Sequence, residues 1–209
     1  DCRSYIERFS RNHLYADHIL EISESIRAKG IRPGIWCDMI LADPRDVDAI
    51  PQEFVIWDWN YWSTGSDDEG TRLWDEGWIT AETLTEDQHA RYPELIDAEG
   101  RFRPFYTADV LKRMGYDVIT CSAARSSGDT AFLPNYPRHV RNIATAARKT
   151  RTAGLLGNCV TSWAVRLNPY ETQAMTIGLA PYALAHPEAS IPEMIHTYGN
   201  GFLGSDIEA

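Results

Sequence analysis

The feature that most constrains the fold is a regular alternation of strand-like and helix-like segments along the chain. Four short apolar runs are predicted to be strands, at residues 33–38, 54–59, 116–122 and 155–163. Helices are predicted at residues 12–29, 104–115, 137–151 and about 169–185. Apolar strands that do not alternate with polar residues are typical of a parallel sheet covered by helices. The sequence therefore predicts an α/β fold.

Helical periodicity is clearest in the first and third of these helices. Tyr15, Ile19, Ile22 and Ile26 share one face of the first, and Gly30 stands just past its end. The third helix is expected to turn its basic residues into solvent, and these are Arg138, Arg141, Arg148 and Lys149.

Four strand–helix units in a row fit half of a (β/α)8 barrel or a small doubly wound sheet. No strand is followed by GxGxxG or GxxxxGK[ST], which disfavours a nucleotide-binding sheet. The strand ends carry Trp, Asp, Ser and Arg instead. Parallel α/β folds build their sites at this edge, so we expect the site there.

The connection at residues 62–103 is unusually long and acidic, and it holds Trp62, Trp74 and Trp78. Connections of this length are functional, disordered or inserted units, and the tryptophans argue against disorder. We interpret it as a lid or loop insertion over the strand ends. Its Asp75–Glu76 pair is expected to be solvated.

Composition narrows the class of ligand. A chain of 209 residues can bury one large core, so residues 1–209 are treated as a single domain. Its net charge of -10 would repel phosphates, which argues against nucleic acid and favours a neutral ligand such as a sugar. No apolar run approaches the roughly 20 residues that span a bilayer, so no membrane partner is expected.

Cysteine and histidine spacing gives no sign of a metal or cofactor. The four cysteines form no CxxC, and three of them lie in or beside apolar strands, as reduced buried thiols do. This pattern, with no secretory signal visible at the start, favours a reducing compartment such as the cytoplasm. The six histidines form no HExxH, and no GxSxG nucleophile motif is present.

Three of the predicted strand ends combine tryptophan with a polar side chain. The combinations are Trp36 with Asp38, Trp57 and Trp59 with Asp58, and Trp163 with Arg166. Sugars present apolar C–H faces and a fringe of hydroxyls, which aromatic walls and polar groups recognise together. A single such Trp fits barrel packing equally well, but three at equivalent positions favour a shared pocket wall.

Strand alternation assigns the carboxylates within these combinations. Asp38 lies two residues after Trp36, so both should point to the same side of an extended strand. Asp58 alternates with Trp57 and Trp59; we therefore place the two tryptophans in the pocket and treat Asp58 as structural.

Glu171 has two open interpretations. In "NPYE", Asn168 is a plausible N-cap, Pro169 the first helical residue and Glu171 the third, which is a capping-box arrangement. A helix N-terminus beside a strand end also borders the site, so Glu171 remains a candidate ligand contact.

Residues of about 10–186 resemble the second half of a glycoside hydrolase family 20 catalytic barrel, closest to its hexosaminidase D-like branch. The segments that carry the resemblance are "LYADHILEISESIRAKGIRPGIWCDMIL", "VIWDWNYW", "FYTADVLKRMGYDVITCSAA" and "RHVRNIATAARKTRTAGLLGNCVTSWAVR". Their order and spacing matter more than any single motif. The resemblance implies the second half of a (β/α)8 barrel with about four parallel strand–helix units.

The resemblance also implies an activity, the retaining hydrolysis of terminal N-acetyl-hexosaminides. In that family the substrate's acetamido oxygen is the nucleophile, held by an Asp, while the adjacent Glu is general acid and then base. Trp36, Trp57 and Trp163 match aromatics that wall the sugar. Asp38 and Arg166 fall where polar contacts to the sugar or to neighbouring site residues are expected.

The family's Asp–Glu pair has no counterpart in this sequence, because it precedes the helix at 12–29. The resemblance therefore implies a chain that supplies pocket walls and no catalytic residue. Two alternatives remain open: a non-catalytic carbohydrate-binding half-barrel, and another barrel hydrolase that uses Asp38 and Glu171 as its carboxylates. A half-barrel also exposes its inner face and sheet edges, so we expect either a homo-oligomer or association with an N-terminal half.

Overall fold

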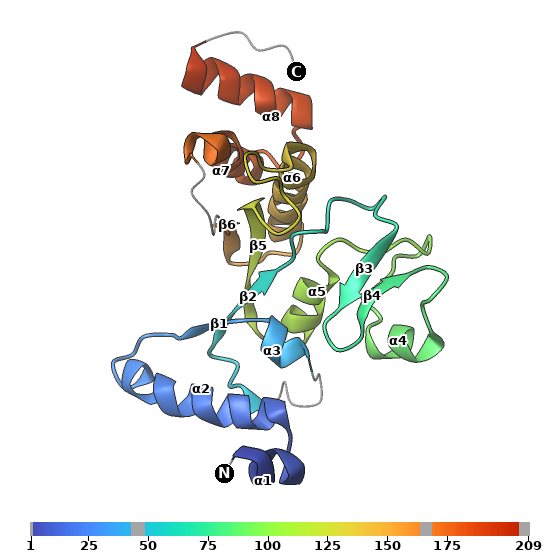
Figure 1. Cartoon of the computed structure of the whole chain (residues 1–209), viewed down its shortest axis with the longest axis vertical. Helices are drawn as coiled ribbons and strands as arrows, with labels where there is room; N and C mark the ends of the chain where they lie inside the picture. The colour runs from blue at the N-terminus through green and yellow to red at the C-terminus, as the bar shows by residue number, and fades with distance from the viewer. Residues whose placement is uncertain (1, 43–48, 164–168, 205–209) are drawn as a thin grey trace.

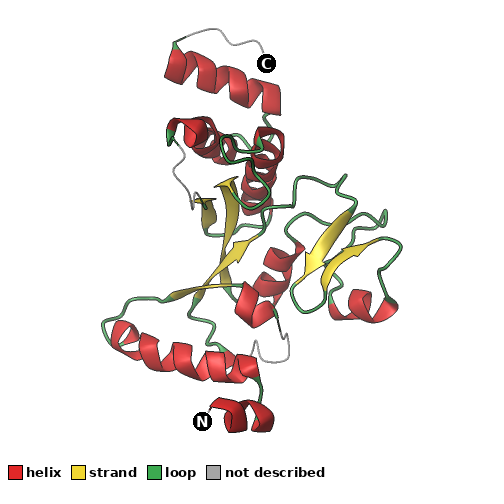
Figure 2. Ribbon diagram, viewed as in Figure 1, coloured by secondary structure: helices red, strands yellow, loops and turns green. Residues whose placement is uncertain are grey.

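The computed structural model describes residues 2–42, 49–163 and 169–204, and it has an α/β fold built on a four-stranded parallel sheet (Figures 1 and 2). The strand order is β1–β2–β5–β6. The strands are β1 (Gly34–Trp36), β2 (Val55–Trp59), β5 (Asp117–Arg125) and β6 (Gly157–Ser162). All four predicted strands and the parallel sheet are confirmed.

Helices follow or precede the strands much as the periodicity indicates. The predicted helices correspond to α2 (Arg11–Arg27), α5 (Tyr106–Arg113), α6 (Tyr136–Thr152) and α7 (Glu171–Ala185). The structure also contains helices that the sequence did not predict, which are α1 (Cys2–Arg8), α3 (Asp38–Leu41), α4 (Glu86–Arg91), α8 (Ile191–Tyr198) and the π-helical turn η2 (Gly199–Leu203). In Figure 1 the sheet lies at the centre, with α1 and α2 at one end and α7 and α8 at the other. No helix in the described ranges is both long enough and apolar enough to cross a bilayer.

One face of the sheet, here called the outer face, is covered by helices. Ile35, Ile56 and Val118 occupy matching register positions on β1, β2 and β5. They are buried in one cluster with residues of α2, α5 and α6, which are Ala16, Ala108, Leu111 and Ala146. Burial of each of the larger aliphatic side chains stabilises the folded state by roughly 1.5–3 kcal/mol. This cluster therefore holds the helices against the sheet.

The opposite, inner face is much less covered. Trp36, Trp57, Ile119 and Gly157 form one register row across all four strands on this face. Trp36 is 39% exposed, and the other members of the row are half-buried. A parallel sheet is ordinarily buried on both faces, so this aromatic surface is an unusual feature of the fold.

The segment 62–103 is ordered. It contains an antiparallel hairpin of β3 (Gly70–Leu73) and β4 (Gly77–Thr80), followed by α4. Its apolar residues form a core shared with α5, in which Leu73 and Leu95 are fully buried beside Tyr106. In Figure 1 this unit projects to one side of the sheet. Its role as a lid stays a prediction.

The expectation that Asp75 and Glu76 are solvated holds for Glu76, which is exposed, and not for Asp75, whose side chain is 15% exposed. Arg91 of α4 forms ion pairs with both carboxylates, and these contacts tie α4 to the hairpin turn. The hydrogen bonds from Arg91 and Gln88 hold the pKa of Glu76 below its ordinary value. The pair therefore has a structural role within the inserted unit.

The basic face of α6 was also misjudged, because most of its charges have partners. Arg138, Arg141 and Lys149 form ion pairs with Asp129, Asp67 and Asp109. These contacts connect α6 to three other segments of the chain. The helix therefore organises the surrounding loops as well as packing against β5.

Candidate functional site

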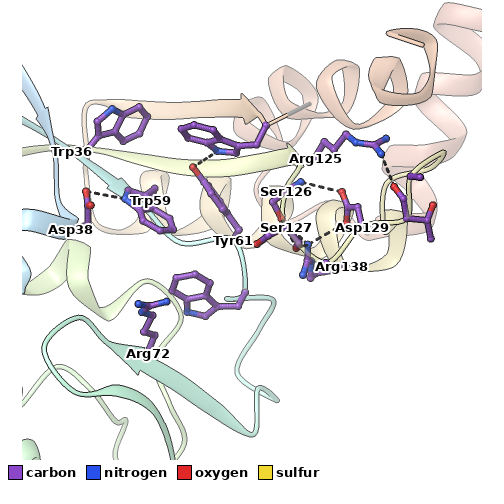
Figure 3. Close-up of a pocket in the computed structure, with 15 residues that line it drawn as sticks. Trp36, Asp38, Trp59, Tyr61, Arg72, Arg125, Ser126, Ser127, Asp129 and Arg138 are labelled. Carbon is purple, nitrogen blue, oxygen red and sulfur yellow. Dashed lines mark hydrogen bonds and ion pairs between the residues drawn. The ribbon is translucent and has the colours of Figure 1, made fainter. Parts of the chain in front are cut away.

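A pocket of about 770 Å³ lies at the C-terminal ends of the strands, where the sequence predicts the site (Figure 3). Its walls come from the ends of β1, β2 and β6, the start of α3 and of α6, strand β3, and the loop after β5. Side chains from six separate parts of the sequence thus meet in one cavity. Its volume is typical of sites for small organic ligands.

Aromatic rings form one wall of this pocket. Trp36 lies 6.4 Å from Trp163 between ring centroids, and Trp163 lies 6.4 Å from Tyr61. The indole Nε1 of Trp163 donates a hydrogen bond to the Tyr61 hydroxyl at 2.7 Å, which ties the end of β6 to the end of β2. Trp59 completes the wall at 5.1 Å from Tyr61. Trp36 and Trp163 are 39% and 47% exposed, so apolar ring surface faces the cavity.

Asp38 lies in the pocket beside Trp36, as predicted, although the local geometry differs from the prediction. Strand β1 ends at Trp36, and Asp38 is the first residue of the short helix α3. The indole Nε1 of Trp59 donates a hydrogen bond to Oδ1 of Asp38 at 3.2 Å. A carboxylate is therefore held at the edge of the aromatic wall.

Trp57 is not among the residues that line the pocket. Its indole lies over Gly34, where an added Cβ would come within 2.5 Å of Nε1, and its ring is 5.8 Å from that of Trp36. Strand alternation places Trp57 and Trp59 on the same face, but a two-residue step along a strand is about 6.6 Å. Trp57 thus lies two residues before Trp59 on β2, in register with Trp36, and packs against the Trp36 ring without lining the pocket.

Asp58 is structural, as the sequence predicts. It is fully buried on the outer face, where the Thr107 hydroxyl donates to its carboxylate at 2.8 Å. Burial raises the pKa of Asp58 to about 6, although hydrogen bonds from Thr107 and Cys37 oppose the rise. Asp58 therefore links β2 to α5 and does not reach the pocket.

Of the two remaining predicted site residues, one lies outside the described residues and the other does not line the pocket. Arg166 lies outside the described residues. Glu171 is exposed and is the first residue of α7, so its placement as the third residue of a capping box was wrong. The residue before the helix, Tyr170, makes no side-chain cap. Glu171 is not among the lining residues either.

The loop after β5 contributes polar groups that the sequence analysis missed. Asp129 accepts hydrogen bonds from the backbone N–H groups of Ser126 at 3.0 Å and Asn135 at 3.1 Å. Arg138 approaches the same carboxylate at 3.3 Å and donates to the Ser126 hydroxyl at 2.7 Å. The cluster of polar residues in "RSSGD" directly after a buried parallel strand was the signal that could have indicated this wall.

Behind Asp129 lies the fully buried His139, with Nε2 at 2.9 Å from Oδ2. Burial lowers the pKa of His139 despite the nearby carboxylate. Burial also raises the pKa of Asp129, but the hydrogen bonds from Ser126, Asn135 and His139 outweigh it and hold that pKa below the ordinary value. A neutral imidazole thus donates to an ionised carboxylate, and the pair fixes the shape of the loop.

A side chain of α6 that the sequence did not single out fixes the turn at the start of the inserted segment. Asn142 of α6 is fully buried, and its Nδ2 donates to the carbonyl oxygens of Asn60 and Ser63 at 2.8 Å. These bonds fix the turn that carries Tyr61 and Trp62 into the pocket. Asparagine supplies two amide donors, which is the number this turn uses.

Opposite the aromatic wall, Arg72 of β3 reaches the pocket from the hairpin (Figure 3). Its guanidinium carbon lies 5.0 Å from the centroid of Trp74 and 5.6 Å from that of Trp62. The sequence analysis gave no role to Arg72, because nothing in "GTRL" indicates that the side chain faces the strand ends.

No group of three or more His, Cys, Asp or Glu side chains that could hold a metal occurs within the described ranges. The pocket therefore offers stacking surfaces, one carboxylate at the wall, arginine side chains and loop hydroxyls. Comparison with models of protein families, with curated proteins and with solved structures finds no match to this chain.

Proposed function

We propose that this chain binds a saccharide in the pocket at the strand ends, and that the sugar is the terminal N-acetyl-hexosamine of a larger glycan. The observation that carries the proposal is the wall of Trp36, Trp59, Tyr61 and Trp163, with Asp38 held at its edge. Exposed ring faces stack against the C–H faces of a sugar, and a carboxylate accepts hydrogen bonds from its hydroxyls.

The proposed architecture is the second half of a (β/α)8 barrel of the glycoside hydrolase family 20 type. Four parallel strands with helices on the outer face, and a half-exposed aromatic inner face, support this proposal. In such a barrel the sites lie at the C-terminal ends of the strands, where this pocket is found. The inner face would be covered by the strands that complete the barrel.

The chain is proposed to contribute to substrate-assisted hydrolysis without supplying the acid/base pair. The pocket lining contains two carboxylates, Asp38 and Asp129, and they are not adjacent. Asp129 is engaged by His139 and Arg138 within its loop. The alternative hydrolase that pairs Asp38 with Glu171 is disfavoured, because Glu171 does not line the cavity.

A non-catalytic carbohydrate-binding module remains the second candidate, because the aromatic wall alone is sufficient for it. The two candidates share the binding step, so that step is tested first. The chain is titrated with N-acetylglucosamine, and binding is measured by tryptophan fluorescence and by calorimetry. Both should give saturable binding with one site. Glucose, which lacks the acetamido group, is the matched control sugar. Failure of both sugars to bind at millimolar concentration would contradict the proposed function.

A further inference from the structure

Arg72 differs from the other cations at the pocket in how it is held. Its side chain is exposed, and its guanidinium lies against the rings of Trp62 and Trp74. Its backbone is fixed as well, because the buried Tyr106 donates from its hydroxyl to the Arg72 carbonyl oxygen at 3.0 Å. Two indoles and a strand thus hold one arginine at the cavity edge.

None of the described carboxylates pairs with this charge. Within the described ranges, the Arg72 guanidinium makes no hydrogen bond or ion pair. The nearest acidic residues along the chain, Asp75 and Glu76, are both paired with Arg91. The neighbouring pocket carboxylate, Asp38, accepts from Trp59. The N–H groups of Arg72 are therefore left for solvent or a ligand.

The other pocket arginines are already engaged in holding the loop after β5. Arg125 donates to the carbonyl oxygen of Thr130 at 2.6 Å, and Arg138 pairs with Asp129. The lining holds three arginines and two aspartates, which gives it one net positive charge, whereas the whole chain carries -10. The pocket lining is thus locally cationic in an acidic protein, and Arg72 is the arginine of the lining that is exposed to solvent.

We propose that Arg72 recognises an acidic substituent, a carboxylate or a sulfate, on the saccharide bound in this pocket. The proposal rests on the proposed function and adds a substrate class to it. Guanidinium presents a planar fork of donors that binds such oxyanions with two parallel hydrogen bonds. Stacking on the indoles holds the fork in place before the ligand arrives, which lowers the entropic cost of binding. The field of an acidic protein otherwise disfavours anions, so a local cation is required.

The test compares three sugars that share one ring: N-acetylglucosamine, N-acetylglucosamine 6-sulfate and N-acetylmuramic acid, whose substituent carries a carboxylate. Each is titrated calorimetrically into the wild-type chain and into Arg72→Gln and Arg72→Lys. Arg151→Gln is the matched control, because it removes one exposed positive charge near the last turn of α6, away from the pocket lining. Melting curves of all variants check folding.

We expect one of the acidic sugars to bind about 10-fold or more tightly than the neutral sugar, which is the scale of a charge-assisted hydrogen bond. Arg72→Gln should remove this preference by weakening the binding of the acidic sugars more than that of N-acetylglucosamine, and Arg151→Gln should leave the preference intact. Arg72→Lys keeps the charge but loses the fork, so it should retain only part of the preference. If Arg72→Gln does not fold, the loss of preference for the acidic sugar in Arg72→Lys tests the proposal instead. The acidic sugar that binds more tightly identifies the substituent as sulfate or carboxylate.

Three results would overturn the proposal while leaving the proposed function standing. The first is equal affinity of the wild type for all three sugars. The second is a preference for an acidic sugar that survives Arg72→Gln, and the third is an equal loss of affinity for all three sugars in that variant. If none of the three sugars binds the wild type, both the role of Arg72 and the proposed function are contradicted.

Discussion

The indole Nε1 of Trp59 donates a hydrogen bond to Oδ1 of Asp38 at 3.2 Å, and this contact joins the ends of the neighbouring strands β1 and β2 inside the pocket. The bond fixes the orientation of the carboxylate. No described residue donates a hydrogen bond to Oδ2, so that oxygen is free to accept one from the proposed sugar.

Asp38→Asn separates these two functions of the carboxylate. Asparagine keeps an acceptor oxygen for Trp59, so we expect the free energy of unfolding to change by less than about 0.5 kcal/mol. The charged acceptor for the sugar is lost, and affinity for N-acetylglucosamine should fall by about 1.5 kcal/mol, roughly 10-fold. Paired denaturation and sugar titration measure both quantities. Unchanged affinity together with early melting would make Asp38 a structural residue.

Asp58 gives a prediction on pH dependence. Its pKa is raised from 3.8 to about 6 by burial, so the folded chain binds this proton more tightly than the unfolded chain does. Its contribution to stability is therefore fully present below about pH 4 and is lost as the pH rises through about 6. Asp58→Asn cannot titrate and keeps an acceptor for Thr107. Relative to wild type, the variant should gain on the order of 3 kcal/mol in unfolding free energy between pH 4 and 7.

Denaturant titrations at several pH values measure this difference directly. Asp87→Asn is the control, because its side chain is 85% exposed and should leave the shape of the pH profile unchanged. Parallel profiles for wild type and Asp58→Asn would show that burial does not perturb this carboxyl group.

The half-exposed inner face leads to a prediction about assembly. A row containing Trp36, Trp57 and Ile119 is only partly covered, and both β1 and β6 are edge strands of a parallel sheet. Exposed apolar patches and open edges favour association. The isolated chain should therefore be a dimer or larger by light scattering. A compact monomer with a cooperative melt would count against the proposed half-barrel architecture.

Catalysis by the isolated chain is expected to be absent. Proton transfer by a positioned carboxyl group contributes about 10²–10⁴-fold to rate, and the pocket lining holds no adjacent Asp–Glu pair. Pure chain should not turn over an aryl N-acetyl-glucosaminide. Turnover that is lost in Asp38→Asn and in Glu171→Gln, but kept in an exposed control such as Asp87→Asn, would establish the hydrolase that uses those two carboxylates.

Much of the sheet could be predicted because its strands are continuous apolar runs separated by strongly periodic helices. The hairpin β3–β4 could not be predicted in the same way. Its strands are four residues each, "GTRL" and "GWIT", and their stability comes from packing against α5 through residues far away in sequence. Short strands of mixed polarity carry little signal of their own.

The site, like the sheet, could be predicted only in part from the sequence. Strand alternation correctly separated Asp58 from its flanking tryptophans, because side chains on a strand point to alternate faces. Alternation could not show which of the two tryptophans would line the cavity, and Trp57 packs against Trp36 on the same face without lining it. Tyr61, Arg72 and Arg138 reach the cavity through a turn, a hairpin and a helix start, and those positions depend on tertiary contacts.

Trp36→Ala tests whether the tryptophan wall binds sugar. Trp36 is 39% exposed, so its removal should cost less stability than the roughly 3–5 kcal/mol typical of a core aromatic. Loss of a stacking surface should instead weaken sugar binding by about 1–3 kcal/mol. Trp78→Ala is the control, since Trp78 is 56% exposed on β4 and does not line the pocket.

The measurement is calorimetric titration of N-acetylglucosamine into wild type, Trp36→Ala and Trp78→Ala, with melting curves of each. We expect Trp36→Ala to bind the sugar at least about 5-fold more weakly than wild type, while its melting temperature stays close to that of Trp78→Ala. If Trp36→Ala binds the sugar as tightly as wild type and melts well below Trp78→Ala, Trp36 is a structural residue and the tryptophan wall is not the sugar site.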